Sequence, residues 1–155
     1  MPDLRAIVFD IGNTLVHAAP VGTAVHGLTG QPIGNAIADL RALSLRYRLA
    51  AVTDTALMTG SDVRDALDRS GFQGLLDPII TSVDIGAPKP DPRGLLTALE
   101  QMHVAPGQAL FIGDADVDRL AAAASGVAFE FAVHDIQIVD IVSTFLRSNE
   151  CVADT

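Results

Sequence analysis

The chain has 155 residues, of which 49% are hydrophobic and 19% are charged, so it can bury a real core. Its formal net charge of −9, with no run rich in lysine or arginine, argues against a nucleic-acid partner recognised through its phosphates. The single cysteine, Cys151, excludes a disulfide framework within the chain and a cysteine-rich zinc site. An acidic protein can still bind a small phosphorylated substrate, because a local metal ion outweighs distant charge.

The chain carries no sign of export or of insertion into a membrane. No leader pattern precedes the first predicted strand, and no apolar stretch approaches the length that crosses a bilayer. We also find no internal repeat, linker or domain boundary. We therefore expect a cytoplasmic protein that has no membrane partner and forms a single domain over residues 1–155.

Short apolar runs recur along the chain and are bounded by glycine, proline or polar residues. Such runs are typical of strands that are buried on both faces of a parallel sheet. The predicted strands cover residues 6–9, 49–52, 78–80, 109–112 and 127–133.

Segments of helical periodicity separate these runs. The first predicted helix opens at Pro32, which suits a first helical turn, and has Arg46 and Arg48 near its end, where positive charge interacts favourably with the helix dipole. Gly71 and Gly126 are expected to end two later helices. The later helices are predicted over residues 61–70, 91–102 and 136–146 and in the alanine-rich segment that ends at residue 125. The alternation predicts an α/β fold, a doubly wound, Rossmann-like parallel sheet of about five strands with helices on both faces.

Polar residues follow three of the predicted strands and could serve one site. Asp10 follows the first strand, Thr53 the second and Asp114 the fourth, and such ends converge on one crevice in a doubly wound sheet. Two carboxylates there would repel each other unless a cation lay between them, and Mg²⁺ prefers such oxygen ligands. Lys89, on a proline-stiffened loop, could supply a positive charge to an anionic substrate. Taken singly, each residue also suits an ordinary role as a cap, a turn former or a solvated side chain.

Taken in order, these residues resemble the four motifs of the haloacid dehalogenase-like (HAD) hydrolases. The first motif places an Asp after an apolar strand, the second a Thr, the third a Lys beside prolines and the fourth a Gly-Asp pair. The matching segments are Asp10-Ile-Gly-Asn-Thr14, Ala50-Ala-Val-Thr53, Lys89-Pro-Asp-Pro92 and Gly113-Asp114-Ala-Asp-Val-Asp118. With their flanking elements, the motifs span residues 6–126.

The resemblance implies a phosphatase that acts through an aspartyl-phosphate intermediate. Asp10 would attack phosphorus, and water would then cleave the phosphorylated enzyme, so that one difficult step becomes two easier ones. Thr53 and Lys89 would hold the transferring phosphoryl group, and Lys89 would also offset the charge of Asp10. The implied substrate is a phosphorylated compound of small or medium size.

The resemblance also implies a magnesium site. The ligands would be the carboxylates of Asp10 and Asp114 and the main-chain carbonyl of Gly12, and the bound ion would shield the nucleophile from the negative charge of the phosphate. Asp118, at the spacing that the fourth motif requires, would hold the metal ligands in place without contacting the ion itself. Asp116 is a weaker candidate for that task, because its spacing does not fit the motif.

The chain departs from the family pattern at Gly12, where family phosphatases usually carry a second Asp that acts as general acid and base. Loss of that group could slow the reaction ~10²–10⁴-fold, and the amide of Asn13 cannot replace it. Gly12 therefore leaves open a second hypothesis, a non-catalytic HAD-like binding module. A third hypothesis is a metal-independent haloacid dehalogenase, against which the metal-ligating acid Asp114 argues.

The spacing of the motifs leaves no room for a sizeable cap domain. Residues 15–52 and 54–88 are already filled by the predicted elements, so the chain resembles a capless family member. An open crevice suits a bulky substrate, or a neighbouring subunit of a homo-oligomer could act as the lid. Loop 16–30, with His17 and His26, is the best remaining candidate for substrate contact, although these histidines are more often solvated loop residues.

Overall fold

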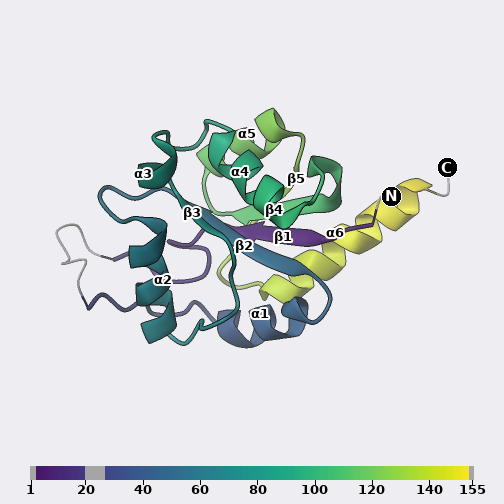
Figure 1. Cartoon of the computed structure of the whole chain (residues 1–155). Coiled ribbons are helices and arrows are strands. Elements are labelled where there is room, and N and C mark those ends of the chain that lie inside the picture. Colours follow the sequence, from purple (N-terminus) through teal and green to yellow (C-terminus); the bar gives the residue numbers. More distant parts are fainter. Residues whose placement is uncertain (1–2, 20–26, 154–155) are drawn as a thin grey trace.

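A computed structural model of the chain describes residues 3–19 and 27–153 (Figure 1). Its centre is a parallel sheet of five strands in the order β3-β2-β1-β4-β5, which confirms the predicted α/β fold. The strands are β1 (Ala6–Phe9), β2 (Arg48–Thr53), β3 (Ile79–Thr81), β4 (Ala109–Gly113) and β5 (Ala128–Phe131). The helices are α1 (Ala36–Ser44), α2 (Gly60–Arg69), α3 (Ser82–Ile85), α4 (Arg93–Met102), the 3₁₀ helix η1 (Pro106–Gln108), α5 (Asp116–Ser125) and α6 (Ile138–Ala153).

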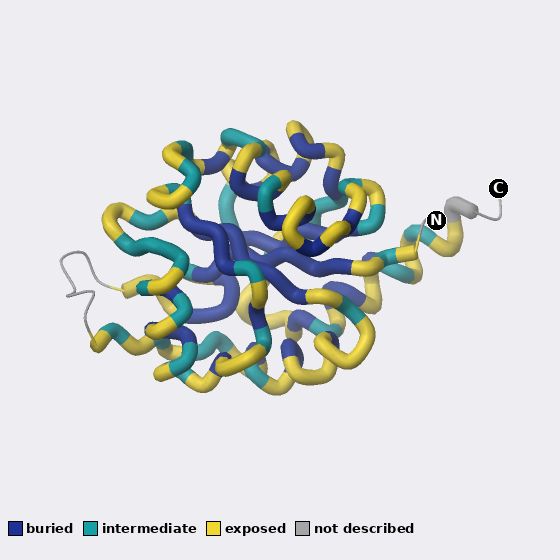
Figure 2. Tube along the Cα trace, in the orientation of Figure 1, coloured by how far each residue is buried: buried dark blue, intermediate teal, exposed yellow. Residues whose placement is uncertain are grey.

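The central strand β1 is buried on both faces of the sheet. Successive side chains of a strand point to opposite faces. Ile7 and Phe9 pack in one core cluster with residues of α1, α2 and α6, whereas Ala6 and Val8 pack in a second cluster with residues of α4 and α5. Figures 1 and 2 show the buried sheet between these two groups of helices. Burial on both faces explains why a continuous apolar run, rather than an alternating pattern, predicts this strand.

The parallel register brings the ends of neighbouring strands to one edge of the sheet. Phe9 of β1 is in register with Ala51 of β2 and with Ile112 of β4. The next residue, Asp10, donates its N–H to the carbonyl of Ile112 at 3.0 Å. Polar residues that follow β1, β2 and β4 are therefore held at the same edge, where open α/β sheets bind their ligands.

The first helix begins later than predicted, at Ala36 rather than at Pro32. Pro32 instead pairs with Val16 in an isolated antiparallel bridge, so its segment runs extended beside the loop that follows β1. Gly34 then adopts a φ of 53°, a left-handed conformation, between this bridge and the helix. The prediction for Arg48 was also wrong, because this residue begins β2 instead of lying at a helix end.

The C-terminal elements also differ in length from the prediction. Strand β5 is shorter, and α6 runs well beyond Leu146. The side chains of Ser148 and Asn149 in this extension hydrogen-bond to carbonyls one turn earlier, at 3.0 and 2.8 Å. The predicted helix stops at Gly71 and Gly126 are confirmed by φ values of 99° and 72°.

None of the helices in the described part of the chain combines the length and the apolar character that crossing a membrane requires.

Candidate active site

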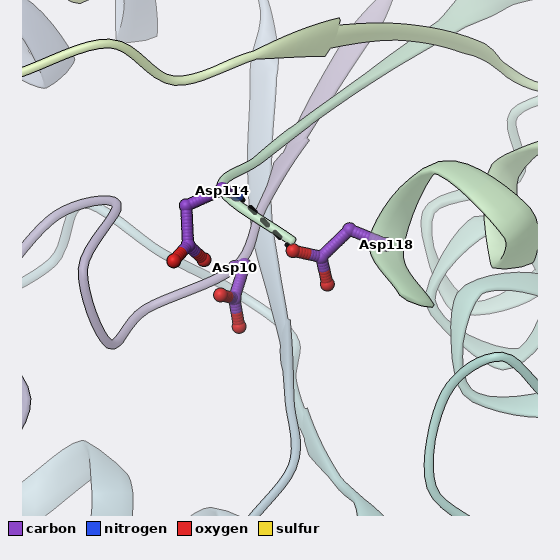
Figure 3. A group of neighbouring side chains, drawn as sticks. All are labelled: Asp10, Asp114 and Asp118. Atoms are coloured by element: carbon purple, nitrogen blue, oxygen red, sulfur yellow. Dashed lines mark hydrogen bonds between the residues drawn. The ribbon is translucent and has the colours of Figure 1, made fainter. Parts of the chain in front are cut away.

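Three predicted site residues lie at the carboxyl edge of the sheet. Thr53 is the last residue of β2, Asp10 follows β1, and Asp114 follows β4. Because β1 lies between β2 and β4, Asp10 lies between the other two. Asp10, Asp114 and Asp118 offer carboxylate oxygens that all lie within 4.8 Å of one another (Figure 3).

Lys89 is buried in the middle of this acidic cluster. Its Nζ donates to Asp10 Oδ1 at 3.0 Å and to the carbonyl of Val52 at 3.1 Å, and it lies 2.5 Å from Asp118 Oδ1. Only 7% of the residue is exposed. The N–H of Lys89 donates to Asp54 Oδ1 at 3.1 Å, which holds the proline-rich loop against the end of β2. The ammonium group therefore has a fixed position between two carboxylates.

Burial and charge act in opposite directions on these groups. Burial raises the pKa of Asp10 to about 6, although the charge of Lys89 opposes this shift. Burial would lower the pKa of Lys89, but the negative charges of Asp10 and Asp118 outweigh it and leave that pKa above its usual value. Lys89 is thus fully protonated at neutral pH, and an ionised Asp10 depends on it.

Asp118 contacts both the main chain at the end of β4 and the side chain of Lys89. Its Oδ2 accepts the N–H group of Asp114 at 3.1 Å (Figure 3). The same oxygen accepts the N–H of Ala115, also at 3.1 Å, while Oδ1 faces Lys89. Gly113 makes this approach possible, because a Cβ there would lie only 2.4 Å from Asp118 Oδ2. Both oxygens of Asp118 are therefore engaged within the protein.

The cluster fits a divalent metal ion in number, charge and ligand type. When all three carboxylates are ionised, three negative charges face the single positive charge of Lys89, so two remain uncompensated. Because Asp118 is engaged by Lys89 and the main chain, Asp10 and Asp114 are the carboxylates that could ligate an ion. Mg²⁺ is commonly held by one or two carboxylates together with substrate phosphate.

Gly12 lies in a tight turn directly after Asp10. Asn13 follows it with a φ of 60°, a left-handed conformation that Asn tolerates better than most residues. Gly12 itself has no such constraint, and a Cβ there would meet only Ala18 Cβ, at an ordinary distance of 3.8 Å. The missing acid is therefore a chemical difference from the family pattern rather than a steric requirement of the turn.

Other candidates named from the sequence lie away from the cluster. Asp116 is exposed and pairs with Arg119 at 3.2 Å. His17 is exposed, with its ring edge-on to that of His134 at 5.9 Å between centroids. His26 lies outside the described residues. Cys151 is exposed on α6.

The structure also brings in residues that the sequence reasoning missed. Asp54 supports the loop of Lys89, and its place directly after the second motif is the one signal that could have found it. Thr14 Oγ1 lies 3.5 Å from Asp114 Oδ1, and His134 Nε2 lies 3.2 Å from the carbonyl of Asn13. His134 is 121 residues from Asn13, and no motif marks it.

Comparison with known proteins agrees with this fold. The sequence model of the haloacid dehalogenase-like hydrolases matches residues 24–132, which is most of the chain. A validoxylamine A 7'-phosphate phosphatase from Streptomyces hygroscopicus subsp. limoneus is 42% identical over 62 residues, which make up 40% of this chain. These residues span only 29% of the length of that phosphatase.

Solved structures show the same fold over nearly the whole chain. A HAD-superfamily hydrolase from Ehrlichia chaffeensis superposes with a TM-score of 0.76 at 18% identity and covers 96% of this chain and 98% of its own. A HAD-superfamily hydrolase from Geobacter sulfurreducens gives a TM-score of 0.67 at 19% identity, with coverages of 81% and 88%. A Lactobacillus plantarum protein assigned as a phosphoglycolate phosphatase gives 0.62 at 25% identity, with coverages of 85% and 87%.

Proposed function

Because the chain belongs to the haloacid dehalogenase-like hydrolases, we propose that it is a Mg²⁺-dependent phosphatase that acts on small or medium phosphorylated compounds. The observation that carries this proposal is the buried Lys89, held between Asp10 and Asp118 beside the carboxylate of Asp114. The names of the Streptomyces and Lactobacillus relatives point to the same reaction class.

In the first step, a carboxylate oxygen of Asp10 attacks phosphorus, and the bond from phosphorus to the ester oxygen breaks. Lys89 holds Oδ1 of Asp10 and so orients the carboxylate before attack. Lys89 and Thr53 bind the transferring phosphoryl group. Asp10, Asp114 and the Gly12 carbonyl would hold Mg²⁺, which would supply positive charge to offset the repulsion between nucleophile and phosphate.

In the second step, water attacks phosphorus, the bond to Asp10 breaks, and inorganic phosphate leaves. The ester oxygen takes up a proton during the first step, and the attacking water loses one during the second. No side chain at Gly12 can carry these protons, so the proton exchange falls to solvent or to the substrate itself. We therefore expect slow turnover that favours esters with good leaving groups.

We further propose that the site works without a cap domain. Between Thr53 and Lys89 the chain forms α2, β3 and α3, which complete the core fold and leave no separate lid. Substrate would reach an open edge of the sheet, or a second copy of the chain would cover it. We propose a cytoplasmic location and, from the net charge of −9, no nucleic-acid partner.

Gly12 supports a second candidate function, a HAD-like module that binds a ligand without turning it over. A metal-independent haloacid dehalogenase is a weaker alternative, because the carboxylate of Asp114, whose main-chain N–H is bound by Asp118, would then have no metal to bind. Steady turnover of any phosphate ester rules out the binding module. Release of chloride from a haloacid without Mg²⁺ would support the dehalogenase.

The deciding experiment measures release of phosphate from an activated aryl phosphate, with Mg²⁺ and with chelator, for the wild type and for Asp10→Asn. We expect metal-dependent activity in the wild type and a loss of about 10⁴-fold or more in the variant, because the nucleophile is gone. Circular dichroism checks that the variant is folded. Equal activity of the two proteins would contradict the proposal.

Metal binding can be tested apart from turnover. Mg²⁺ binds the folded state, so it should raise the melting temperature of the wild type. Asp114→Asn removes one proposed ligand and should abolish most of this increase, whereas Asp116→Asn, which changes an exposed acid outside the cluster, should retain it. An equal increase in both variants would argue against the proposed ligand set.

A further inference from the structure

A pocket of about 450 Å³ opens on the β2 side of Asp10, away from Asp114. Its described walls come from the loop after β1, the loop after β2, residues 28–30 and one face of α2. A concave space of this volume with mainly apolar walls is typical of small-molecule sites. The reaction steps above assign no part of the substrate to this pocket.

Helix α2 forms a rigid apolar wall of the pocket. Val63, Ala66, Leu67 and Ser70 all line it, at a spacing that puts them on one helix face. The first three are buried, and a capping box at Thr59 fixes the start of the helix. The shape of this wall is therefore set by the protein core before any ligand binds.

The pocket continues from the candidate active site. Gly12 and Thr53, which both belong to the predicted site, also line the pocket. Gly12 has no side chain to project into the pocket, and a Cβ there would lie 3.8 Å from Ala18 Cβ, which belongs to another lining residue. An ester whose phosphorus lies at Asp10 can therefore extend its organic group into the pocket.

The charge of the pocket selects against anionic groups. Its described lining residues include no lysine or arginine, and their titratable side chains are those of His17 and Asp54. Asp54 is held in place by the N–H of Lys89 at 3.1 Å. A carboxylate on the substrate would face Asp54 with no lysine or arginine among the described lining residues to balance it, and such repulsion lowers affinity. Arg69, which donates to the carbonyl of Leu28 at 3.0 Å, is exposed and lies outside the lining.

We propose that this pocket receives the leaving group of the ester, and that the substrates are phosphate monoesters of uncharged, largely apolar alcohols or phenols rather than phosphorylated carboxylic acids. The inference rests on the proposed phosphatase function, because that function places the ester at Asp10. It goes further by assigning the organic part of the substrate to the surface between Gly12 and α2.

The test compares kcat/KM for 1-naphthyl phosphate and for 4-carboxyphenyl phosphate in the presence of Mg²⁺. Both esters release a phenol, so the ratio reports mainly how the organic group is bound. We expect the wild type to prefer the naphthyl ester by about 10-fold or more. The inference is overturned if the wild type hydrolyses both esters equally well or prefers the carboxylated one.

Leu57 offers a variant that changes the pocket without disturbing the core. It lines the pocket and is 78% exposed, so Leu57→Arg should fold normally. The added cation should reduce the preference for the naphthyl ester about 10-fold or reverse it. Leu45, which is 86% exposed and lies outside this pocket, gives the matched control Leu45→Arg, which should keep the wild-type ratio. Equal ratios in the two variants would overturn the inference.

Binding without turnover separates the two proposals. Calorimetry with 1-naphthol and 4-hydroxybenzoate, the products of the two esters, should show the same preference in the wild type and its reduction in Leu57→Arg. If neither ester is hydrolysed but this binding preference is found, the phosphatase proposal fails and the pocket assignment is supported. If both esters are hydrolysed but neither the rates nor the binding show the preference, the pocket assignment fails and the phosphatase proposal stands.

Discussion

The two sides of the catalytic edge hold their side chains in different ways. In the charged cluster at the ends of β1 and β4, Asp10, Lys89 and Asp118 are buried and bonded to one another and to the main chain. On the β2 side, the pocket is mainly apolar, and its rim residue Leu57 is largely exposed. A buried charge must keep its partners, whereas an exposed apolar side chain can change at little expense in stability. Under the two proposals above, the reaction and the choice of substrate would be separable in this molecule.

Lys89→Met should have the largest effect, because it removes the cation from the charged cluster. The variant leaves Asp10 and Asp118 buried without their cation, and loss of one partner of a buried pair lowers the free energy of unfolding by about 3–5 kcal/mol. Urea denaturation at neutral pH measures the change. The control Arg119→Met breaks an exposed pair with Asp116 and should change stability by at most about 1 kcal/mol. Similar losses in the free energy of unfolding in both variants would show that the buried ion pairs of Lys89 contribute no more to stability than the exposed pair of Arg119.

Gly12→Asp tests the position that is shared by the proposed catalytic site and the pocket. The space next to Gly12 accepts a Cβ at 3.8 Å from Ala18, so the fold should tolerate the change. A restored general acid should raise kcat by about 10²–10⁴-fold for esters with poor leaving groups, with a smaller gain for activated aryl esters. Gly12→Asn adds similar bulk without the acid and serves as the control. An equal response to both variants would exclude proton transfer as the missing function.

Gly113→Ala should have the smallest effect of the three and tests the connection between β4 and Asp118. The added Cβ would lie 2.4–2.7 Å from atoms of the Asp118 side chain, so that side chain must move from its present position against the end of β4. Such overpacking lowers stability by about 1–3 kcal/mol. Gly107→Ala, where a Cβ meets nothing within 4 Å, is the control and should change little. A Gly113→Ala protein as stable as its control would contradict the proposed packing.

The sequence predicts those parts of the fold that depend on local chemistry. Apolar runs identify the strands because the sheet is buried on both faces, and Gly71 and Gly126 mark helix ends because each adopts a left-handed φ. The prediction failed at Pro32, which suits a first helical turn and an extended bridge equally well. The bridge with Val16 decided between them, and no pattern within the helix itself encodes that contact.

The sequence by itself determined which chemical groups stand at the ends of the strands, because strand position and motif order are local properties. Only the tertiary structure decided how those groups meet. Lys89 contacts Asp10, which lies 79 residues earlier in the chain, and also Asp118, which lies later in the chain. These contacts depend on the register of β1 against β2 and β4, which places the strand ends at one edge of the sheet. The pocket beside Gly12 is likewise a product of packing, since segments distant in the sequence form its walls. Local propensity can place a side chain on an element, but contact between elements depends on how the whole core is filled.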